Sequence, residues 1–96
     1  MKTVTDEKLD KYFDYTSRAL KKVKLMKGIS EKDKKIAEDF LQMAKTYFED
    51  AKYFRKKGEY VTAFAAVTYA HAWLDAGARA RFFDVGGDSE LFVVDK

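Results

Sequence analysis

The chain has 96 residues, of which 36% are charged and 16% are aromatic. This length suits one domain with a modest core, and the high aromatic content predicts that the core is ordered. The sequence contains no cysteine, which excludes disulfides, zinc–thiolate sites and thiol catalysis. A formal net charge of +3 is too small to indicate nucleic-acid binding by itself.

The first helix is expected over residues 5–26. Its apolar side chains recur every three or four residues, as they do along one face of a helix; they include Leu9, Tyr12, Phe13, Ala19, Leu20, Val23 and Met26. Lysines crowd the last turns and Gly28 follows. This pattern is typical of a helix C-terminus, because cations and a left-handed glycine suit the free carbonyl groups.

A second helix is expected over residues 31–57. Ser30 is a suitable N-cap, and Glu31 and Asp33 place acidic side chains in the first turn. Gly58 marks the end of the helix. Apolar residues at alternating spacings of three and four indicate a face that packs in a bundle; they are Ala37, Phe40, Ala44, Tyr47, Ala51 and Phe54.

The third helix is expected over residues 60–83 and contains the least charged part of the chain. The window Val61–Leu74 has no Asp, Glu, Lys or Arg, and it is shorter than the roughly 20 apolar residues that span a bilayer. We therefore expect a helix buried by protein. Gly77 inside it costs about 1 kcal/mol relative to alanine, which predicts close packing at that position.

Together these elements predict an all-α fold, a three-helix up-and-down bundle over residues 1–85 with a short extended C-terminal tail over residues 86–96. Gly86 and Gly87 end the regular structure, and the apolar residues 91–94 of the tail are expected to pack on the bundle or on another chain. No signal peptide is visible, so we expect a cytoplasmic protein with no membrane partner.

One side of the third helix is expected to need additional cover. Tyr69 and Trp73, with Ala66 and Ala76, lie away from the side that the first two helices bury. Either the tail or the same surface of a second copy can cover them. Aromatic side chains beside small ones are also typical of an interaction hot spot.

A polar group on the third helix has the residue types of a catalytic or metal site. Thr68, His71, Asp75 and Arg79 share one arc of the helix. Asp75 follows His71 by four residues, so its carboxylate can orient the imidazole as a general base, or both can ligate a metal. Neither site is complete, because a second histidine and the HExxH pattern are absent. The sequence therefore predicts no catalytic residue, metal or cofactor, and a histidine at the core margin is the favoured interpretation.

A bundle that runs up, down and up brings many basic residues to one end. This candidate anion-binding pole comprises Lys21, Lys22, Lys24, Lys34, Lys35, Arg79 and Arg81. It can attract phosphate groups, including those of nucleic acid. Lysines and arginines also favour helix C-termini for electrostatic reasons, and no glycine-rich phosphate loop accompanies them. A solvated basic surface is therefore the simpler interpretation.

Residues 37–85 closely resemble an archaeal family called domain of unknown function 357. The resemblance rests on AEDFL at 37–41, YFEDAKYF at 47–54, GEY at 58–60 and YAHAWLDAG at 69–77. It implies a three-helix up-and-down bundle and an archaeal origin. It implies no activity, cofactor or catalytic residue.

These observations favour a non-enzymatic protein-interaction or homo-oligomerisation module. The alternative is an RNA- or nucleotide-binding accessory protein that uses the basic pole. A hydrolase centred on His71 and Asp75 is the third hypothesis.

Overall fold

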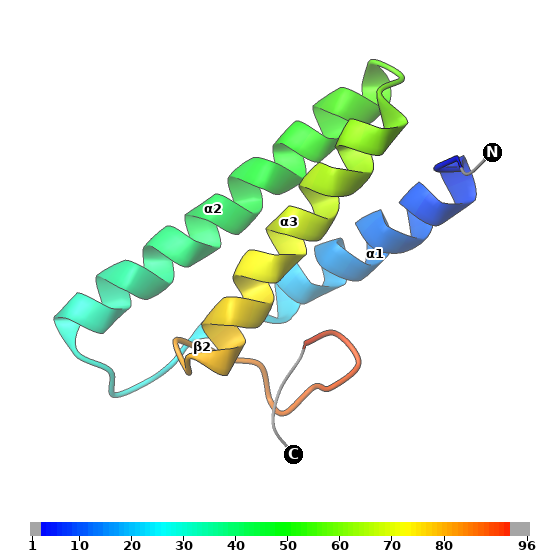
Figure 1. Cartoon of the computed structure of the whole chain (residues 1–96). Coiled ribbons are helices and arrows are strands. Elements are labelled where there is room, and N and C mark those ends of the chain that lie inside the picture. Colours follow the sequence, from blue (N-terminus) through cyan, green and yellow to red (C-terminus); the bar gives the residue numbers. More distant parts are fainter. Residues whose placement is uncertain (1–2, 93–96) are drawn as a thin grey trace.

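The computed structural model describes residues 3–92, which fold into three helices and two short strands (Figure 1). In chain order the elements are α1 (Asp6–Lys22), β1 (Lys24–Leu25), α2 (Glu31–Lys56), α3 (Tyr60–Arg79) and β2 (Phe83–Asp84). The fold is elongated, with extents of 47 × 26 × 19 Å. The all-α three-helix bundle expected from the sequence is confirmed, with a two-stranded antiparallel sheet added at one end.

The first two helices begin at side chains that cap their free amides. The Oγ1 atom of Thr5 accepts a hydrogen bond from the N–H of Lys8 at 3.1 Å, and the Oγ atom of Ser30 accepts one from Asp33 at the same distance. Both caps replace a hydrogen bond that the first turn of a helix cannot make internally. Helix α2 therefore begins at the position that the N-cap residue Ser30 predicts.

The sequence-based range for the first helix is too long at its C-terminal end. The helix stops at Lys22 rather than near Met26, because Val23 adopts an extended conformation with φ −67° and ψ 137°. Residues 24–25 then pair with residues 83–84, and the N–H of Met26 donates to the carbonyl of Phe82 at 2.8 Å. Strand pairing between distant segments thus overrides the local helical pattern.

The third helix is also shorter than the expected range of 60–83. It ends at Arg79, and the chain reverses at Arg81, whose φ of 63° is left-handed. The N–H of Arg81 donates to the carbonyl of Ala78, and the N–H of Phe82 donates to that of Gly77. This pair of hydrogen bonds is the Schellman motif that terminates helices. Phe82 and Phe83 are therefore not helical.

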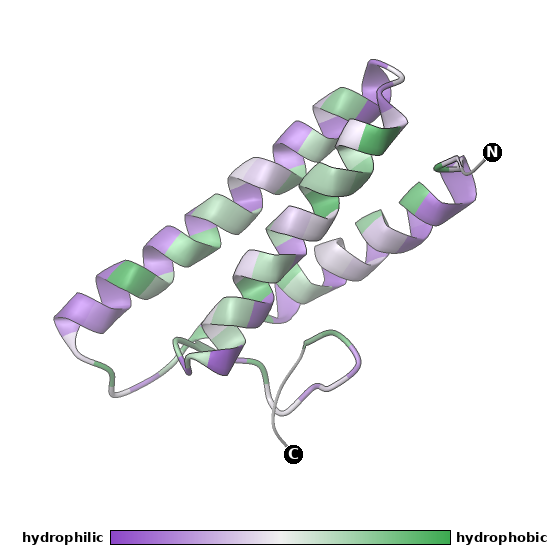
Figure 2. Ribbon diagram, in the orientation of Figure 1, coloured by the Kyte–Doolittle hydropathy of each residue, from purple (hydrophilic) through white to green (hydrophobic). Residues whose placement is uncertain are grey.

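Helix α3 lies between the other two helices and holds most of the core. It packs closely against α2, and small side chains on both helices let the two backbones approach. In α2, fully buried alanines recur every seven residues, at Ala37, Ala44 and Ala51. In α3, Ala63 and Ala70 are also fully buried and seven residues apart. The backbones of α1 and α2 stay further apart, and larger side chains such as Phe13 and Phe48 meet between them. Figure 2 shows that α3 is pale to green along most of its length, whereas α1 and α2 alternate between purple and green.

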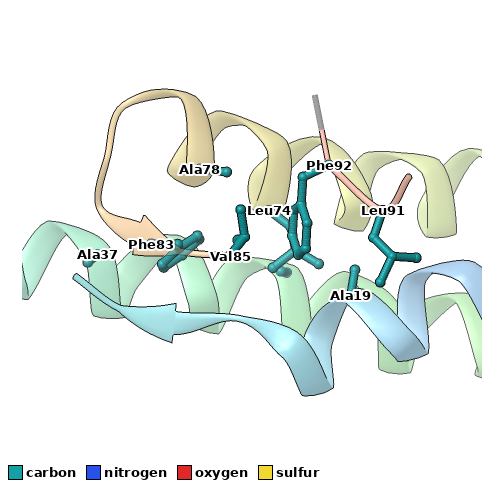
Figure 3. Packing of buried hydrophobic residues seen from close by; sticks show 9 residues of the cluster. Ala19, Ala37, Leu74, Ala78, Phe83, Val85, Leu91 and Phe92 are labelled. Carbon is teal, nitrogen blue, oxygen red and sulfur yellow. The ribbon is translucent and has the colours of Figure 1, made fainter. Parts of the chain in front are cut away.

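Gly77 accommodates the ring of Phe83, which explains why a glycine stands inside α3. A Cβ atom at Gly77 would lie 2.1 Å from Cε2 of Phe83, and the Phe83 side chain is only 2% exposed. Figure 3 shows Phe83 lying between the end of α3 and α2. The close packing expected at Gly77 therefore comes from the strand that follows α3.

The described part of the tail packs on the bundle. Leu91 and Phe92 are 4% and 2% exposed and belong to the same cluster as Leu74 and Ala19 (Figure 3). The apolar tail residues Val93 and Val94 lie outside the described residues. The tail thus covers the side of α3 that faces α1.

Candidate functional site

His71 lies at the contact between α1, α3 and the tail. Its Nδ1 atom is 3.0 Å from Oγ1 of Thr16, and its Nε2 atom is 2.7 Å from the carbonyl oxygen of Leu91. The ring of Tyr15 stacks on the imidazole at a centroid distance of 4.6 Å, and the Tyr15 hydroxyl donates to the carbonyl of Glu90. His71 itself is 8% exposed. These contacts hold the tail against α1 and α3.

The hydrogen bonds of His71 use both ring nitrogens. A carbonyl oxygen only accepts, so Nε2 carries a proton, and Nδ1 of the neutral ring accepts from the hydroxyl of Thr16. Asp75 Oδ1 is 3.8 Å from Nε2, which is too far for a hydrogen bond. A general base needs a free lone pair facing its substrate, and this ring has none. The geometry favours the interpretation of His71 as a structural histidine.

The structure brings together three of the four polar residues that the sequence grouped on α3. Thr68, His71 and Asp75 line one shallow hollow with Tyr12 and Tyr15, whereas Arg79 does not line it. The hydroxyl of Thr68 donates back to the carbonyls of its own helix at 3.0 Å. Burial raises the pKa of the Tyr15 hydroxyl, and the nearby carboxylates of Asp75 and Asp88 add to this effect.

Helix α3 presents an outward face that bears no charge. Thr62, Ala65, Tyr69, Ala72, Ala76 and Ala80 are all exposed and recur every three or four residues, so they form one stripe along the helix. Tyr69 is 48% exposed, and Val61 beside the stripe is 71% exposed. We call these six residues the outward face of α3. The sequence-based face included Tyr69 and Ala76, which lie on it, and Trp73, which is half-buried at its edge toward α2. Ala66, also included in that face, is instead buried in the cluster that contains Phe48 and Ala51.

Aromatic residues of α2 border this face. Tyr47 meets Tyr69 edge to face at 4.6 Å, and Phe40 meets Trp73 in the same way at 4.9 Å. A hollow of about 390 Å³ opens between α2 and α3 beside Tyr69, with apolar walls and Asp50 at its margin. The tail packs on the other side of α3, so its described residues leave Tyr69 uncovered. Of the two covers expected for this face, the described part of the tail therefore does not supply one, and cover by a second copy stays a prediction.

Trp73 has an unusual polar group. Its indole Nε1 atom is the one buried side-chain nitrogen or oxygen within residues 3–92 that has no hydrogen-bond partner. Buried polar groups of this kind are rare in folded proteins and cost free energy. The indole is therefore held in place by its aromatic neighbours rather than by a hydrogen bond.

The basic residues of the candidate anion-binding pole lie at one end of the molecule, as the up-and-down topology requires. Figure 1 places the C-terminal ends of α1 and α3 and the N-terminal end of α2 at this end. Lys22 pairs with Asp88 at 3.8 Å, and Arg79 and Arg81 line a hollow of about 280 Å³ beside the loop 85–87. Lys21, Lys24, Lys34 and Lys35 are exposed and do not line that hollow.

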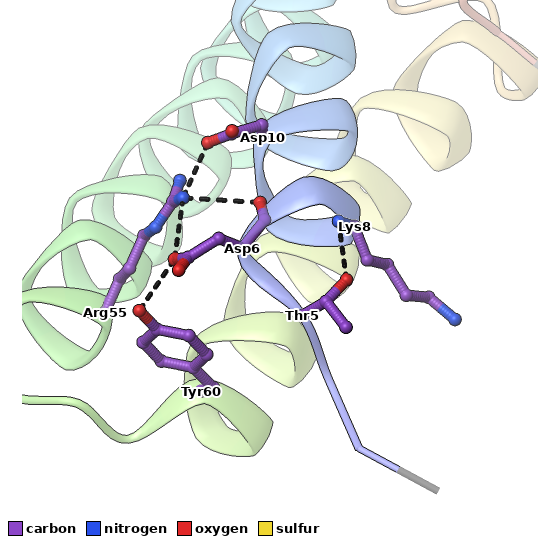
Figure 4. Close-up of polar contacts among 6 residues, drawn as sticks. All are labelled: Thr5, Asp6, Lys8, Asp10, Arg55 and Tyr60. Atoms are coloured by element: carbon purple, nitrogen blue, oxygen red, sulfur yellow. Dashed lines mark hydrogen bonds and ion pairs between the residues drawn. The ribbon is translucent and has the colours of Figure 1, made fainter.

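The opposite end is held by an ionic cluster that the sequence analysis missed (Figure 4). Arg55 of α2 approaches Asp10 at 2.6 Å and Asp6 at 3.3 Å, and the hydroxyl of Tyr60 donates to Asp6 at 2.6 Å. The Tyr60 hydrogen bond, followed by those of Arg55, lowers the pKa of Asp6. These partners are 45 to 54 residues apart in the chain, so no local sequence pattern predicts their contact. The cluster fastens the start of α1 to α2 and α3.

Neither a candidate metal site nor a candidate membrane-spanning helix occurs among the described residues. No group of three or more potential ligands that could hold a metal ion occurs within residues 3–92. None of the helices there is long and apolar enough to cross a membrane.

Comparison with known proteins gives a family but no activity. Residues 11–83 match the profile of the family described as "Protein of unknown function (DUF357)". The match covers more than half of the chain, and the chain therefore belongs to this family. Neither the curated proteins nor the solved structures contain a match.

Proposed function

We propose that this protein is a non-enzymatic interaction module that self-associates through the outward face of α3. The observation that carries the proposal is an uncharged, exposed helical stripe on a chain in which 36% of residues are charged. A helix face exposed to water is normally polar. Tyr69 on this face and Trp73 at its border are residue types enriched in interface hot spots, and the lack of charge along the face is typical of an interface core.

The spacing of the stripe fits a second copy of itself. A two-fold axis beside the midpoint of Ala70 and His71 sets two antiparallel α3 helices face to face. Tyr69 then lies opposite Ala72 of the second copy, and Ala65 lies opposite Ala76. Each large side chain meets a small one, and alanines let the backbones approach closely. Such an isologous dimer buries both copies of Tyr69.

The charges at the edges of the face are also compatible with this pairing. The antiparallel arrangement places Thr62 opposite Arg79 of the second copy. No like charges are brought together along the stripe itself, which avoids the usual cost of pairing identical surfaces.

Sedimentation velocity over a range of protein concentrations tests the proposal. We expect a concentration-dependent dimer at about 100 μM, which Ala72→Glu abolishes by placing a carboxylate against Tyr69 of the second copy. Gln42→Glu is the matched control, because it adds the same charge at an exposed position of α2 away from this face. A protein that stays monomeric at about 100 μM, or a dimer equally weakened by both variants, contradicts the proposal.

The register has its own test. Ala65→Lys and Ala76→Glu should each weaken the homodimer, and a mixture of the two should recover association, since the antiparallel pairing sets position 65 against position 76. Circular dichroism of each variant shows whether the fold is kept. Recovery from a mixture of Ala65→Lys and Ala72→Glu instead would show a different register.

The other two hypotheses have weaker support. A hydrolase at His71 lacks a free base, since Thr16 and Leu91 occupy both ring nitrogens. Binding of RNA or a nucleotide rests on the basic pole, whose most enclosed part is the hollow beside Arg81.

A further inference from the structure

A small hollow at the end of α3 combines a cationic rim with an apolar floor. Its volume is about 280 Å³, and its wall includes Arg79, Arg81, Met26, Phe83, Gly86 and Gly87. Phe83 and Val85 are buried, so they form the floor, while both arginines are exposed. The two glycines have no side chains, which leaves the backbone of their loop accessible from the hollow.

Among the residues that the structure describes, Arg81 has a backbone conformation that is otherwise found only at glycine. Within the described residues, the other positions with positive φ are Gly28, Gly58, Gly86 and Gly87. A residue with a Cβ atom is strained in this conformation, because the Cβ approaches the neighbouring carbonyl. Arg81 is the single exception, and it lines the hollow.

The end of α2 contains the same turn with a glycine at the position that Arg81 takes at the end of α3. There the N–H of Gly58 donates to the carbonyl of Arg55, and that of Glu59 donates to Phe54, both at 2.9 Å. The end of α3 repeats these two hydrogen bonds with Arg81 in the place of Gly58. Glycine is the favoured residue at this position of the motif. Strain that persists where glycine would relieve it is characteristic of functional positions.

We propose that this hollow binds the phosphate group of a small phosphorylated molecule. Arginine presents a planar fork of donors that matches two oxygens of a phosphate, and Arg81 places such a group at the rim of the hollow. The loop at Gly86 and Gly87 lets the ligand approach the backbone, and the volume of about 280 Å³ leaves room for a small organic part. This site is separate from the outward face of α3, so the proposal stands independently of self-association.

Asp84 also lines the hollow and needs an explanation, because a carboxylate repels phosphate. Its Oδ1 atom accepts a hydrogen bond from the N–H of Gly86 at 3.0 Å, which shapes the loop. Lys24 stands directly across from Asp84 in the strand pair, so opposite charges are neighbours there. Asp84 is therefore oriented by the loop and neighboured by a lysine, and Arg81 adds a cation to the same wall.

The size and surface of the hollow favour a small ligand over RNA. A volume of about 280 Å³ is close to the lower end of the range for small-molecule sites, roughly 300–1,000 Å³. Single-stranded nucleic acid is held by exposed aromatic rings on which bases stack. The aromatic residue of this hollow, Phe83, is 2% exposed and cannot serve as such a platform.

Nuclear magnetic resonance titration of the ¹⁵N-labelled full chain tests the site. The probes are inorganic phosphate, adenosine monophosphate, and adenosine without a phosphate. We expect the two phosphate-bearing probes to shift the amides of Gly86 and Gly87, and adenosine to leave them unchanged. A single-stranded RNA oligonucleotide is the fourth probe. Tighter binding of RNA, with no response to the monophosphate, overturns the proposal.

Arg81→Gly is the decisive variant, because glycine suits the backbone and only the guanidinium is lost. We expect phosphate affinity to fall at least about tenfold, as expected for a charge-assisted hydrogen bond, while thermal stability is kept or increased. Lys27→Ala removes a charge at the same end of the molecule, outside the hollow, and should change affinity by less than about twofold. Equal losses in both variants would mean diffuse attraction to the pole rather than a site.

Gly58→Arg completes the comparison by placing arginine in the matched turn of α2. We expect this variant to lower the thermal midpoint and to leave phosphate affinity unchanged. Sedimentation of Arg81→Gly should match that of the parent chain, so a failed titration and a failed dimer are separate outcomes. Loss of stability in Arg81→Gly would show that the side chain is structural and would overturn the argument from strain.

Discussion

Gly77→Ala should destabilise the protein, although alanine is the better helix former. In an exposed helix the exchange stabilises by about 1 kcal/mol. Here the new Cβ atom would lie 2.1 Å from the Phe83 ring, well inside the 3.0 Å that real Cβ contacts respect. Overpacking of a core costs about 1–3 kcal/mol, and the depth of this overlap places it at the upper end.

The net loss is therefore about 2 kcal/mol, the difference between roughly 3 kcal/mol of overlap and roughly 1 kcal/mol of helix propensity. For a domain of this size, that corresponds to a fall in the thermal midpoint of about 8–16 °C. Thermal unfolding followed by circular dichroism measures it. A comparison of Lys45→Gly with Lys45→Ala provides the propensity scale at an exposed position of α2, with an expected difference of about 1 kcal/mol.

A double-mutant cycle with Phe83→Leu separates the two effects. The smaller side chain removes the ring that meets the new Cβ atom. In that background Gly77→Ala should cost less than about 0.5 kcal/mol or become stabilising, which is a positive coupling between the two positions. If Gly77→Ala stabilises the parent protein by about 1 kcal/mol, the packing of Phe83 on α3 is wrong as described.

Two further predictions concern the tail. His71→Ala removes the hydrogen bond to Leu91, so amide exchange over residues 88–92 should accelerate while the interface of α2 and α3 keeps its protection; equal acceleration in both regions would contradict a local role. Asp88 accepts hydrogen bonds from the N–H groups of Leu91 and Glu90, and these, with Lys22, lower its pKa. Its contribution is complete above the unfolded-state pKa of about 3.9 and is lost as pH falls through the lower folded-state value. Urea midpoints measured from pH 6 to pH 2 should therefore fall less steeply below about pH 4 in Asp88→Asn than in the parent, and identical slopes would refute this contribution.

The helices and their order follow from local sequence patterns. The Ser30 cap, the glycine at position 58 and the regular spacing of Ala37, Ala44 and Ala51 are all short-range signals. They report on the backbone within a few turns, so they predict where α2 lies and which face it buries. The close packing at Gly77 also followed from sequence, since a glycine inside a helix has to be compensated.

The ends of α1 and α3 depended on contacts that no local pattern contains. Val23 and Met26 continue an apolar helical stripe, yet both lie outside the helix because residues 24–25 pair with residues 83–84. The end of α3 was not predicted for a similar reason, since position 81, which follows the helix, holds arginine where glycine would have been the signal. At both helix ends, strand pairing and the burial of Phe83 stabilise the observed structure more than the few local interactions that would continue the helix.

The roles of the polar residues were likewise a matter of tertiary structure. Sequence placed His71 and Asp75 on one arc of a helix, but the partners of the imidazole are Thr16 and Leu91, which lie 55 and 20 residues away. A side chain's chemistry depends on what fills the space around it, and that space is built by segments distant in the chain. The sequence by itself thus determined three amphipathic helices and their inner faces, while only their packing decided which nitrogens are occupied, which arginines share a hollow and which face of α3 stays bare.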